Sequence, residues 1–238
     1  MRILYLIPGS LLQTEHGHQE KQRRERILAS YVSPGTAVEV TDIGEGPTSI
    51  ESAYEEHLAV PGAVEASVQA EKKGYQGIIL GCFADPGISA VRERVRVPVV
   101  GPGECAMHTA AILGDRFSII TVLDSVVPSL EKLAKLVGMA QNLASIHTIQ
   151  TPVLEVGKNP EGVAEKVLHE AQKAVREERA GALVLGCMSL GFLGISERVQ
   201  EAVGVPVVNP VPVALKFAEM LIASRLTFSP KVYPFPPR

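Results

Sequence analysis

Two cysteines in matching sequence contexts are the residues of this chain best suited to chemistry. Cys82 ends the string GIILGC, and Cys187 ends the similar string ALVLGC. A short apolar run that stops at a glycine is typical of a buried strand of a parallel sheet, and ligands bind beyond the carboxyl ends of such strands. A single cysteine is more often a small buried apolar side chain than a reactive group. The matched pair, one in each half of the chain, favours a function.

A pair of thiols is suited to moving protons at carbon. Racemising a carbon next to a carbonyl requires one group to remove a proton from one face and another to deliver a proton to the opposite face. Cysteine can do either, because its ordinary pKa of about 8.5 allows thiol and thiolate near neutral pH. The glycines at 81 and 186 let the backbone approach a substrate closely, and N–H groups after each cysteine can donate to a developing enolate oxygen.

Composition indicates a soluble globular protein. The 238 residues are 46% hydrophobic and 21% charged, with a net charge of −3 and basic residues scattered among acids, so no nucleic-acid or anionic-membrane surface is expected. No apolar run reaches the ~18 residues of a membrane helix, and Met1 leads directly into an expected strand rather than a signal peptide. Three cysteines indicate thiols rather than a disulfide framework, and Cys105 is expected to be structural. We therefore expect a cytoplasmic protein.

The chain alternates between apolar strand patterns and amphipathic helix patterns, which predicts α/β architecture with parallel sheets. The expected strands are 3–7, 37–43, 77–80, 97–100, 117–123, 145–150, the run before Cys187, and 205–208. The expected helices are 19–30, 53–58, 62–73, 89–95, 104–113, 127–136, 161–178, 197–202 and 213–224.

The two halves of the sequence repeat each other. Cys187 follows Cys82 by 105 residues, and the second Val-x-Val-Pro-Val-Val string follows the first by 108. We expect an N-terminal α/β half over 1–114, whose last helix packs there or on the other half, and a C-terminal half over 115–225. Each half would hold a parallel sheet of about four strands flanked by helices. Pseudo-twofold symmetry would then place the cysteines across a cleft, and the proline-rich tail, 226–238, would lie on the surface or on a neighbouring subunit.

Long motifs carry a resemblance to a known family. These motifs are GCFADPG at 81–87, GPTSIESAYEEHLAVPG at 46–62, VPVVGPGECAMHTAAILGDRFSIITVL at 97–123 and LGCMSLGFL at 185–193. Together with the proline-rich tail they span nearly the whole chain. The sequence resembles the aspartate/glutamate/hydantoin racemase superfamily, and within it the hydantoin racemases and their allantoin racemase relatives.

The resemblance implies a cofactor-independent isomerase that acts on 5-substituted hydantoins or a related cyclic ureide such as allantoin. It assigns Cys82 and Cys187 as the two acid/base residues and implies neither metal nor pyridoxal cofactor. Similar enzymes are homo-oligomers, so a small-molecule substrate and further copies of this chain are the expected partners.

The resemblance also points to binding residues, with one departure. Relatives carry an Asn-rich polar loop after the first strand, whereas here the loop is PGSLL, in which only Ser10 has a hydroxyl. Ser10 and Thr121 are expected to supply much of the side-chain hydrogen bonding to substrate, while Phe83 and Met188 make the pocket less polar. Asp85 either bonds the thiol or the substrate amide, or belongs to an ordinary Asp-Pro-Gly turn.

Two other functions remain open on the sequence. Aspartate and glutamate racemases resemble this chain but carry Asn-Thr or Thr-His after the cysteines to bind an α-carboxylate, whereas here Phe83-Ala84 and Met188-Ser189 follow. Arylmalonate decarboxylase, another fold relative, uses one catalytic cysteine, so the presence of two in this chain argues against that activity. A non-catalytic small-molecule-binding protein of the same fold is the second alternative, although such a protein has no need for two matched thiols.

Overall fold

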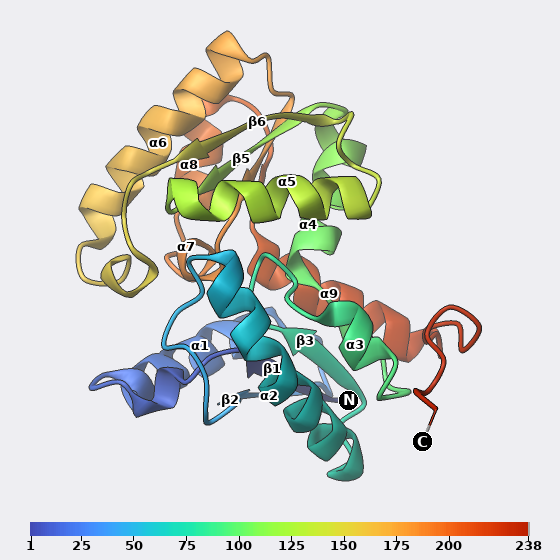
Figure 1. Ribbon diagram of the computed structural model, residues 1–238. Helices are drawn as coiled ribbons and strands as arrows, with labels where there is room; N and C mark the ends of the chain where they lie inside the picture. Colours follow the sequence, from blue (N-terminus) through green and yellow to red (C-terminus); the bar gives the residue numbers. More distant parts are fainter. Residues whose placement is uncertain (238) are drawn as a thin grey trace. The chain divides into compact units, whose positions relative to one another are not determined.

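The computed structural model describes residues 1–237 and divides the chain into two compact units (Figure 1). The first unit contains residues 1–50, 54–102 and the chain from residue 214 onward. The second unit contains residues 51–53 and 103–213.

Each unit is built on one parallel sheet of four strands. The strands of the first unit are β1 (Arg2–Ile7), β2 (Ala37–Asp42), β3 (Gly77–Leu80) and β4 (Val99–Val100), in the order β2-β1-β3-β4. Those of the second are β5 (Phe117–Thr121), β6 (Leu143–Thr148), β7 (Ala182–Leu185) and β8 (Val207–Val208), in the order β6-β5-β7-β8. All the strand pairs in these sheets are parallel. The predicted fold class, two similar α/β subdomains, is confirmed, and equivalent strands occupy equivalent places in the two sheets.

Helices connect the strands, as parallel pairing requires. They are α1 (Gly17–Tyr31), α2 (Ala53–Lys72), α3 (Ile88–Arg92), α4 (Pro102–Gly114), α5 (Val127–Leu136), α6 (Pro160–Glu177), α7 (Met188–Gly191), α8 (Ser196–Val203) and α9 (Pro210–Ala223). The expectation of two separate helices over 53–58 and 62–73 was wrong. One helix, α2, runs through Pro61 although proline removes one backbone donor, because Ala59 and Ala63 on either side of it are buried.

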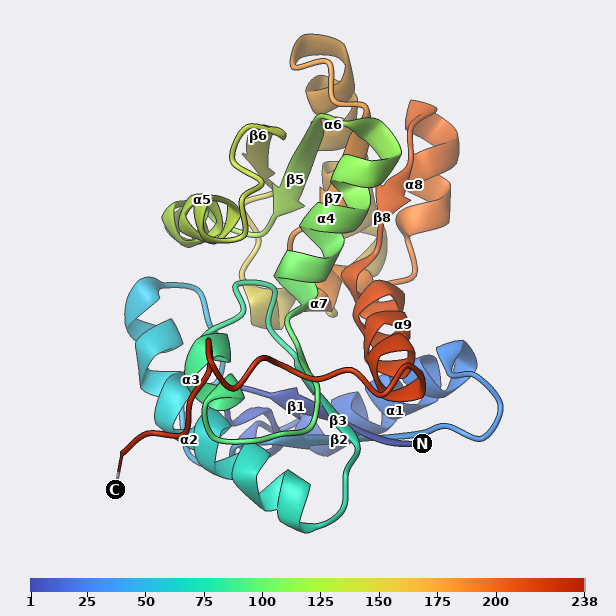
Figure 2. The same cartoon turned by 90° about the vertical axis from the view of Figure 1, so that its right-hand side faces the viewer.

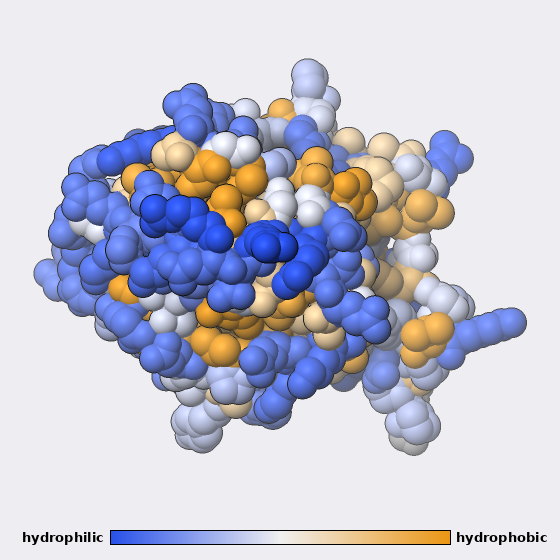
Figure 3. All heavy atoms as spheres, turned by 90° about the horizontal axis from the view of Figure 1, so that it is seen from above, coloured by the Kyte–Doolittle hydropathy of each residue, from blue (hydrophilic) through white to orange (hydrophobic). Residues whose placement is uncertain are grey.

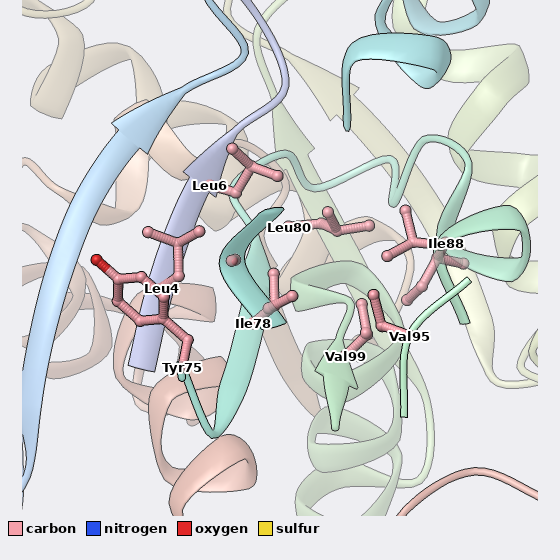
Figure 4. Close-up of a cluster of buried hydrophobic side chains, with 10 residues drawn as sticks. Leu4, Leu6, Tyr75, Ile78, Leu80, Ile88, Val95 and Val99 are labelled. Carbon is pink, nitrogen blue, oxygen red and sulfur yellow. The ribbon is translucent and has the colours of Figure 1, made fainter. Parts of the chain in front are cut away.

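The first sheet is covered on both faces. Every second residue of β1 and β3 points to the same face of the sheet. On one face these residues form a cluster with side chains of α3 (Figure 4): Leu4, Leu6, Ile78 and Leu80. The opposite face, to which Gly77 belongs, is approached by Ile222 of α9. Strands buried on both faces explain the nearly continuous apolar runs of the sequence.

The last helix of each expected half belongs to the other unit, an arrangement that the sequence leaves open for the first half and does not predict for the second. Helix α4 follows β4 along the chain but belongs to the second unit, where the end of α4 at Gly114 meets the backbone of Gly181 just before β7. Helix α9 follows β8 along the chain, but most of it belongs to the first unit. There the carboxylate of Glu219 accepts hydrogen bonds from Ser33, which lies between α1 and β2. The two units therefore exchange the helices that follow their fourth strands.

The C-terminal tail lies on the surface of the first unit (Figure 2). The guanidinium group of Arg92 lies 4.1 Å from the ring centroid of Phe228, and that of Arg96 lies 3.5 Å from the ring of Phe235. Arg96 also donates a hydrogen bond to the carbonyl oxygen of Tyr233, at 3.2 Å. Cation–π contacts and this hydrogen bond thus fasten residues 226–237, which form no helix or strand.

The surface is mixed in polarity. The face drawn in Figure 3 shows hydrophilic residues with separate apolar patches between them. Within residues 1–237, no helix has both the length and the apolar composition for crossing a membrane.

Candidate active site

Cys82 lies in a tight loop at the carboxyl end of β3. The N–H of Gly81 donates to the carbonyl oxygen of Leu6 at 2.7 Å, so pairing with β1 continues one residue past β3. A side chain at Gly81 would place its Cβ 2.5 Å from the ring of Tyr5, so only glycine fits there. The N–H of Cys82 then turns back to the carbonyl oxygen of Leu80 at 2.8 Å, and the cysteine is partly exposed.

Cys187 occupies the equivalent position in the second unit. The N–H of Gly186 donates to the carbonyl oxygen of Ile120 on β5 at 2.7 Å, and a Cβ at Gly186 would overlap with Ile119. Cys187 itself is extended (φ −153°, ψ 135°), directly precedes α7, and is 9% exposed. In each unit, therefore, a glycine that is bonded to the neighbouring strand, β1 or β5, positions a cysteine at the carboxyl edge of the sheet.

Asp85 closes the loop that contains Cys82. Its N–H donates to the carbonyl oxygen of Cys82 at 3.1 Å, and its backbone is left-handed (φ 51°), a conformation in which Asp is enriched. The carboxyl group is buried beside Gly101, where a Cβ would overlap with it. The carbonyl oxygen of Asp85 accepts the N–H of Ile88 at 3.2 Å, so the Asp-Pro-Gly segment is a turn, and a bond of Asp85 to the thiol or the substrate amide stays a prediction.

The remaining predicted binding residues are buried in the unit to which each belongs. Ser10 donates its hydroxyl to the carbonyl oxygen of Gly46 at 2.8 Å, and Thr121 donates its hydroxyl to that of Gly186 at 3.0 Å. Phe83 and Met188, which follow the two cysteines, are each 3% exposed. Their predicted contacts with substrate stay predictions.

Within each unit the predicted residues share one edge of the sheet. Ser10 follows β1 and Cys82 follows β3, and these strands are neighbours. Thr121 ends β5 and Cys187 follows β7, which are also neighbours. Sequence reasoning missed Asn209, which follows β8 and contacts α7 in the second unit.

A second polar cluster lies elsewhere in the second unit, between β6 and α6. His147 bonds Glu170 through Nδ1 at 3.1 Å and Ser145 through Nε2 at 3.0 Å. Burial tends to raise the pKa of Glu170, but hydrogen bonds from Lys173 and His147 outweigh it and lower this pKa. A surface hollow of about 590 Å³ adjoins the cluster at Glu170. None of the predicted site residues lines this hollow, and the bond between His147 and Glu170 joins α6 to the edge strand β6.

Comparisons with known proteins agree on one family. The family described as Asp/Glu/Hydantoin racemase matches residues 21–218. The chain is 36% identical over 237 residues to a hydantoin racemase of Pseudomonas sp. (strain NS671), covering 99% of this chain and 92% of that protein. Solved allantoin racemases from Klebsiella pneumoniae and Pseudomonas fluorescens are each 30% identical, with TM-scores of 0.90 and 0.91. The alignments cover 100% of this chain and 94% and 98% of those two chains.

Proposed function

Because this chain belongs to the Asp/Glu/hydantoin racemase family and is an isomerase of that kind, we propose that it racemises 5-substituted hydantoins or a related cyclic ureide such as allantoin. The reaction takes place without metal or pyridoxal cofactor and uses Cys82 and Cys187 as its acid/base pair. The enzyme acts in the cytoplasm, where thiols stay reduced.

One observation carries the proposal. Each unit places a Gly-Cys pair at the carboxyl edge of its sheet, with the glycine N–H bonded to the central strand. All three cysteines are present as thiols, of which Cys105 lies within α4 rather than at a strand end. A fold that needed a small apolar residue at these two positions would not need sulfur at both.

The proposed chemistry balances without an oxidant or reductant. One cysteine, as thiolate, takes the proton from the ring carbon next to the carbonyl, and the C–H electron pair moves into an enolate. The other cysteine, as thiol, donates its proton to the opposite face of that carbon. The product is the other enantiomer, and the two sulfurs have exchanged protonation states.

The residues beside the cysteines support a cyclic ureide over an amino acid. An α-carboxylate needs cationic or hydrogen-bonding groups in its pocket. Phe83 and Met188, which are both apolar, follow the cysteines instead. A hydantoin ring carries its polar atoms as uncharged amides, so it fits a less polar pocket.

A substrate panel tests the proposal. Enantiopure 5-alkyl and 5-aryl hydantoins, allantoin, aspartate and glutamate are each incubated with the purified protein, without added metal or cofactor, and followed by polarimetry. We expect loss of rotation with at least one hydantoin or with allantoin, and none with the amino acids. Constant rotation throughout, with a folded sample, would leave a binding protein as the better explanation.

We also propose that the enzyme is a homo-oligomer. Large apolar side chains are exposed on the isolated chain, including Ile112 at 83% and Leu136 at 74%. Burial of such side chains against further copies is favourable. Light scattering on the eluting protein should give a mass of at least twice 25.4 kDa, and a mass of 25.4 kDa would contradict the proposal.

A further inference from the structure

Asn209 joins the end of β8 to the helix that follows Cys187. Its Nδ2 donates to the carbonyl oxygen of Gly191 at 2.9 Å, and the side chain is 7% exposed. The N–H of Gly191 in turn donates to the carbonyl oxygen of Cys187 at 3.1 Å. The carboxamide of Asn209 is therefore linked to the backbone of Cys187 through a single residue, Gly191.

The fit between Asn209 and Gly191 is close. A Cβ at Gly191 would lie 2.6 Å from Oδ1 of Asn209 and 2.9 Å from Val211. A side chain at 191 would displace the carboxamide of Asn209 or shift α7, so the bond between Asn209 and the backbone at 191 depends on this glycine.

The two ends of the carboxamide have separate tasks. Oδ1 accepts the N–H of Val211 at 3.0 Å, which is the ordinary role of a residue that caps the N-terminus of a helix, here α9. Capping needs only the oxygen, and serine or aspartate does it equally well. The Nδ2 donor is not needed for the cap, so its bond to Gly191 requires another explanation.

The first unit has an equivalent contact in which the glycine and the polar residue have exchanged places. Gly101 follows β4 where Asn209 follows β8, and the polar side chain is Asp85, on the loop of Cys82. In both units a side-chain amide or carboxyl group packs against a glycine to join the cysteine loop to the end of the fourth strand. Because this contact recurs beside both cysteines, we relate it to the positions of the cysteine loops and not to the capping of α9 alone.

We infer that Asn209 is a positioning residue for Cys187: its Nδ2 donor fixes α7, and thereby the direction and burial of the Cys187 thiol. This inference rests on the proposed two-thiol reaction for its catalytic consequence. The burial of the thiol does not depend on that reaction. The two can therefore be tested apart.

The decisive variant is Asn209→Ser, which keeps a capping oxygen, adds no charge and removes the donor. The matched control is Asn142→Ala, because Asn142 also donates its Nδ2 to a backbone carbonyl, that of Asp115 at 2.8 Å, but at the opposite end of the second sheet. Asn209→Asp serves as a second variant that is nearly isosteric and also lacks the donor.

The first readout is alkylation by iodoacetamide, measured peptide by peptide with mass spectrometry in the folded protein. In Asn209→Ser, Cys187 should react at least about threefold faster, since its burial is relaxed, while Cys82 and Cys105 stay within about 1.5-fold of the parent. Parallel acceleration of all three cysteines would indicate general loosening and overturn the inference. An unchanged rate at Cys187 would do the same.

The second readout is turnover of whichever substrate the panel identifies. A misdirected but more reachable thiol should lower kcat by about tenfold or more with KM within about threefold, and Asn142→Ala should match the parent. An unchanged kcat in both Asn209 variants would overturn the catalytic part. If the parent racemises nothing on the panel, the proposed function fails, and the alkylation rates alone decide whether Asn209 positions Cys187.

Discussion

The hydroxyl of Thr121 donates a hydrogen bond of 3.0 Å to the carbonyl oxygen of Gly186, the residue before Cys187. Thr121 is fully buried at the end of β5, so this bond is not exchanged for one to water. The bond joins the end of β5 to the loop that contains Cys187.

Replacing Thr121 by valine keeps the shape of the side chain and removes the donor. The carbonyl of Gly186 then loses a buried partner, so the free energy of unfolding should fall by about 1–3 kcal/mol. Because the loop of Cys187 is released, kcat/KM should fall at least about fivefold. Urea unfolding and steady-state kinetics measure the two effects. Thr148→Val is the control, since the Thr148 hydroxyl donates to Asp124 in an exposed place. Equal behaviour of the two variants would contradict this role of Thr121.

Ser10 is expected to matter in the first unit for a related reason. Its hydroxyl donates to the carbonyl oxygen of Gly46 and its N–H donates to that of Pro47, both at 2.8 Å, so it fixes the loop after β1. Ser10→Ala should lower kcat/KM by more than about twofold, which corresponds to ~0.5 kcal/mol of transition-state binding. Ser30→Ala removes a similar bond, to Ile27, at an exposed site and should have no effect on turnover. A change below twofold in Ser10→Ala would show that the loop is held without its hydroxyl.

The two-thiol mechanism makes a prediction for each cysteine. Cys82→Ser and Cys187→Ser should each abolish racemisation, because proton removal and proton delivery need different groups. Each variant should still exchange the α-proton of one enantiomer with deuterium, and the two variants should differ in which enantiomer that is. Cys105→Ser should do both reactions normally. Proton NMR in D₂O on each pure enantiomer follows both processes. Racemisation at the parent rate by either single variant of Cys82 or Cys187 would falsify the mechanism.

Glu219 predicts a loss of stability in acid. Burial tends to raise the pKa of this carboxyl group, but bonds from Lys216 and from the N–H and hydroxyl of Ser33 outweigh it and lower the pKa to about 2. Since the pKa in the unfolded chain is about 4.3, the carboxylate stabilises the fold fully above that pH. The stabilisation disappears as the pH falls from about 5 toward 2.

The measurement is urea unfolding of the parent and of Glu219→Gln between pH 7 and pH 3. The two curves should lie far apart at pH 7 and converge as the pH falls. Glu155→Gln is the control, because the Glu155 pair with Lys158 is solvent-exposed and contributes at most about 1 kcal/mol. A difference between parent and Glu219→Gln that stays constant with pH would mean that the charge of Glu219 does not stabilise the fold.

The strands and the two cysteine loops were predictable because their signals are local. An apolar run such as Ile78–Leu80 followed by glycine is buried whatever surrounds it, and it marks the strand end where Cys82 lies. The break expected between the helices 53–58 and 62–73 was also a local inference, but burial of α2 on both sides of Pro61 outweighed it. Boundaries set by propensity alone are the weaker part of such predictions.

The bond of Asn209 to Gly191 and the placement of α9 in the first unit were not predicted, and the unit to which α4 belongs was left open. The Asn-Pro pair at 209 is what a helix start looks like, and its oxygen does cap α9, so the sequence accounts for Asn209 without the bond to Gly191. The sequence did hold one indication of this contact, because the repeat aligns Asn209 with Gly101. A polar residue in one half and a glycine at the equivalent position of the other indicate that the two loops are held by different contacts. The periodicity of a helix shows that it buries one face but does not show which sheet covers that face.

The placement of α4 and α9 also bears on how such a chain can be divided. A fragment of residues 1–114 would carry a helix that completes the absent unit and would lack the helix that lies over Gly77. Two copies of one half that each placed the last helix on the other copy would have the arrangement of a domain-swapped dimer. Joining the copies into one polypeptide makes that exchange intramolecular, at an effective concentration on the order of millimolar, and so keeps it independent of how much protein is present.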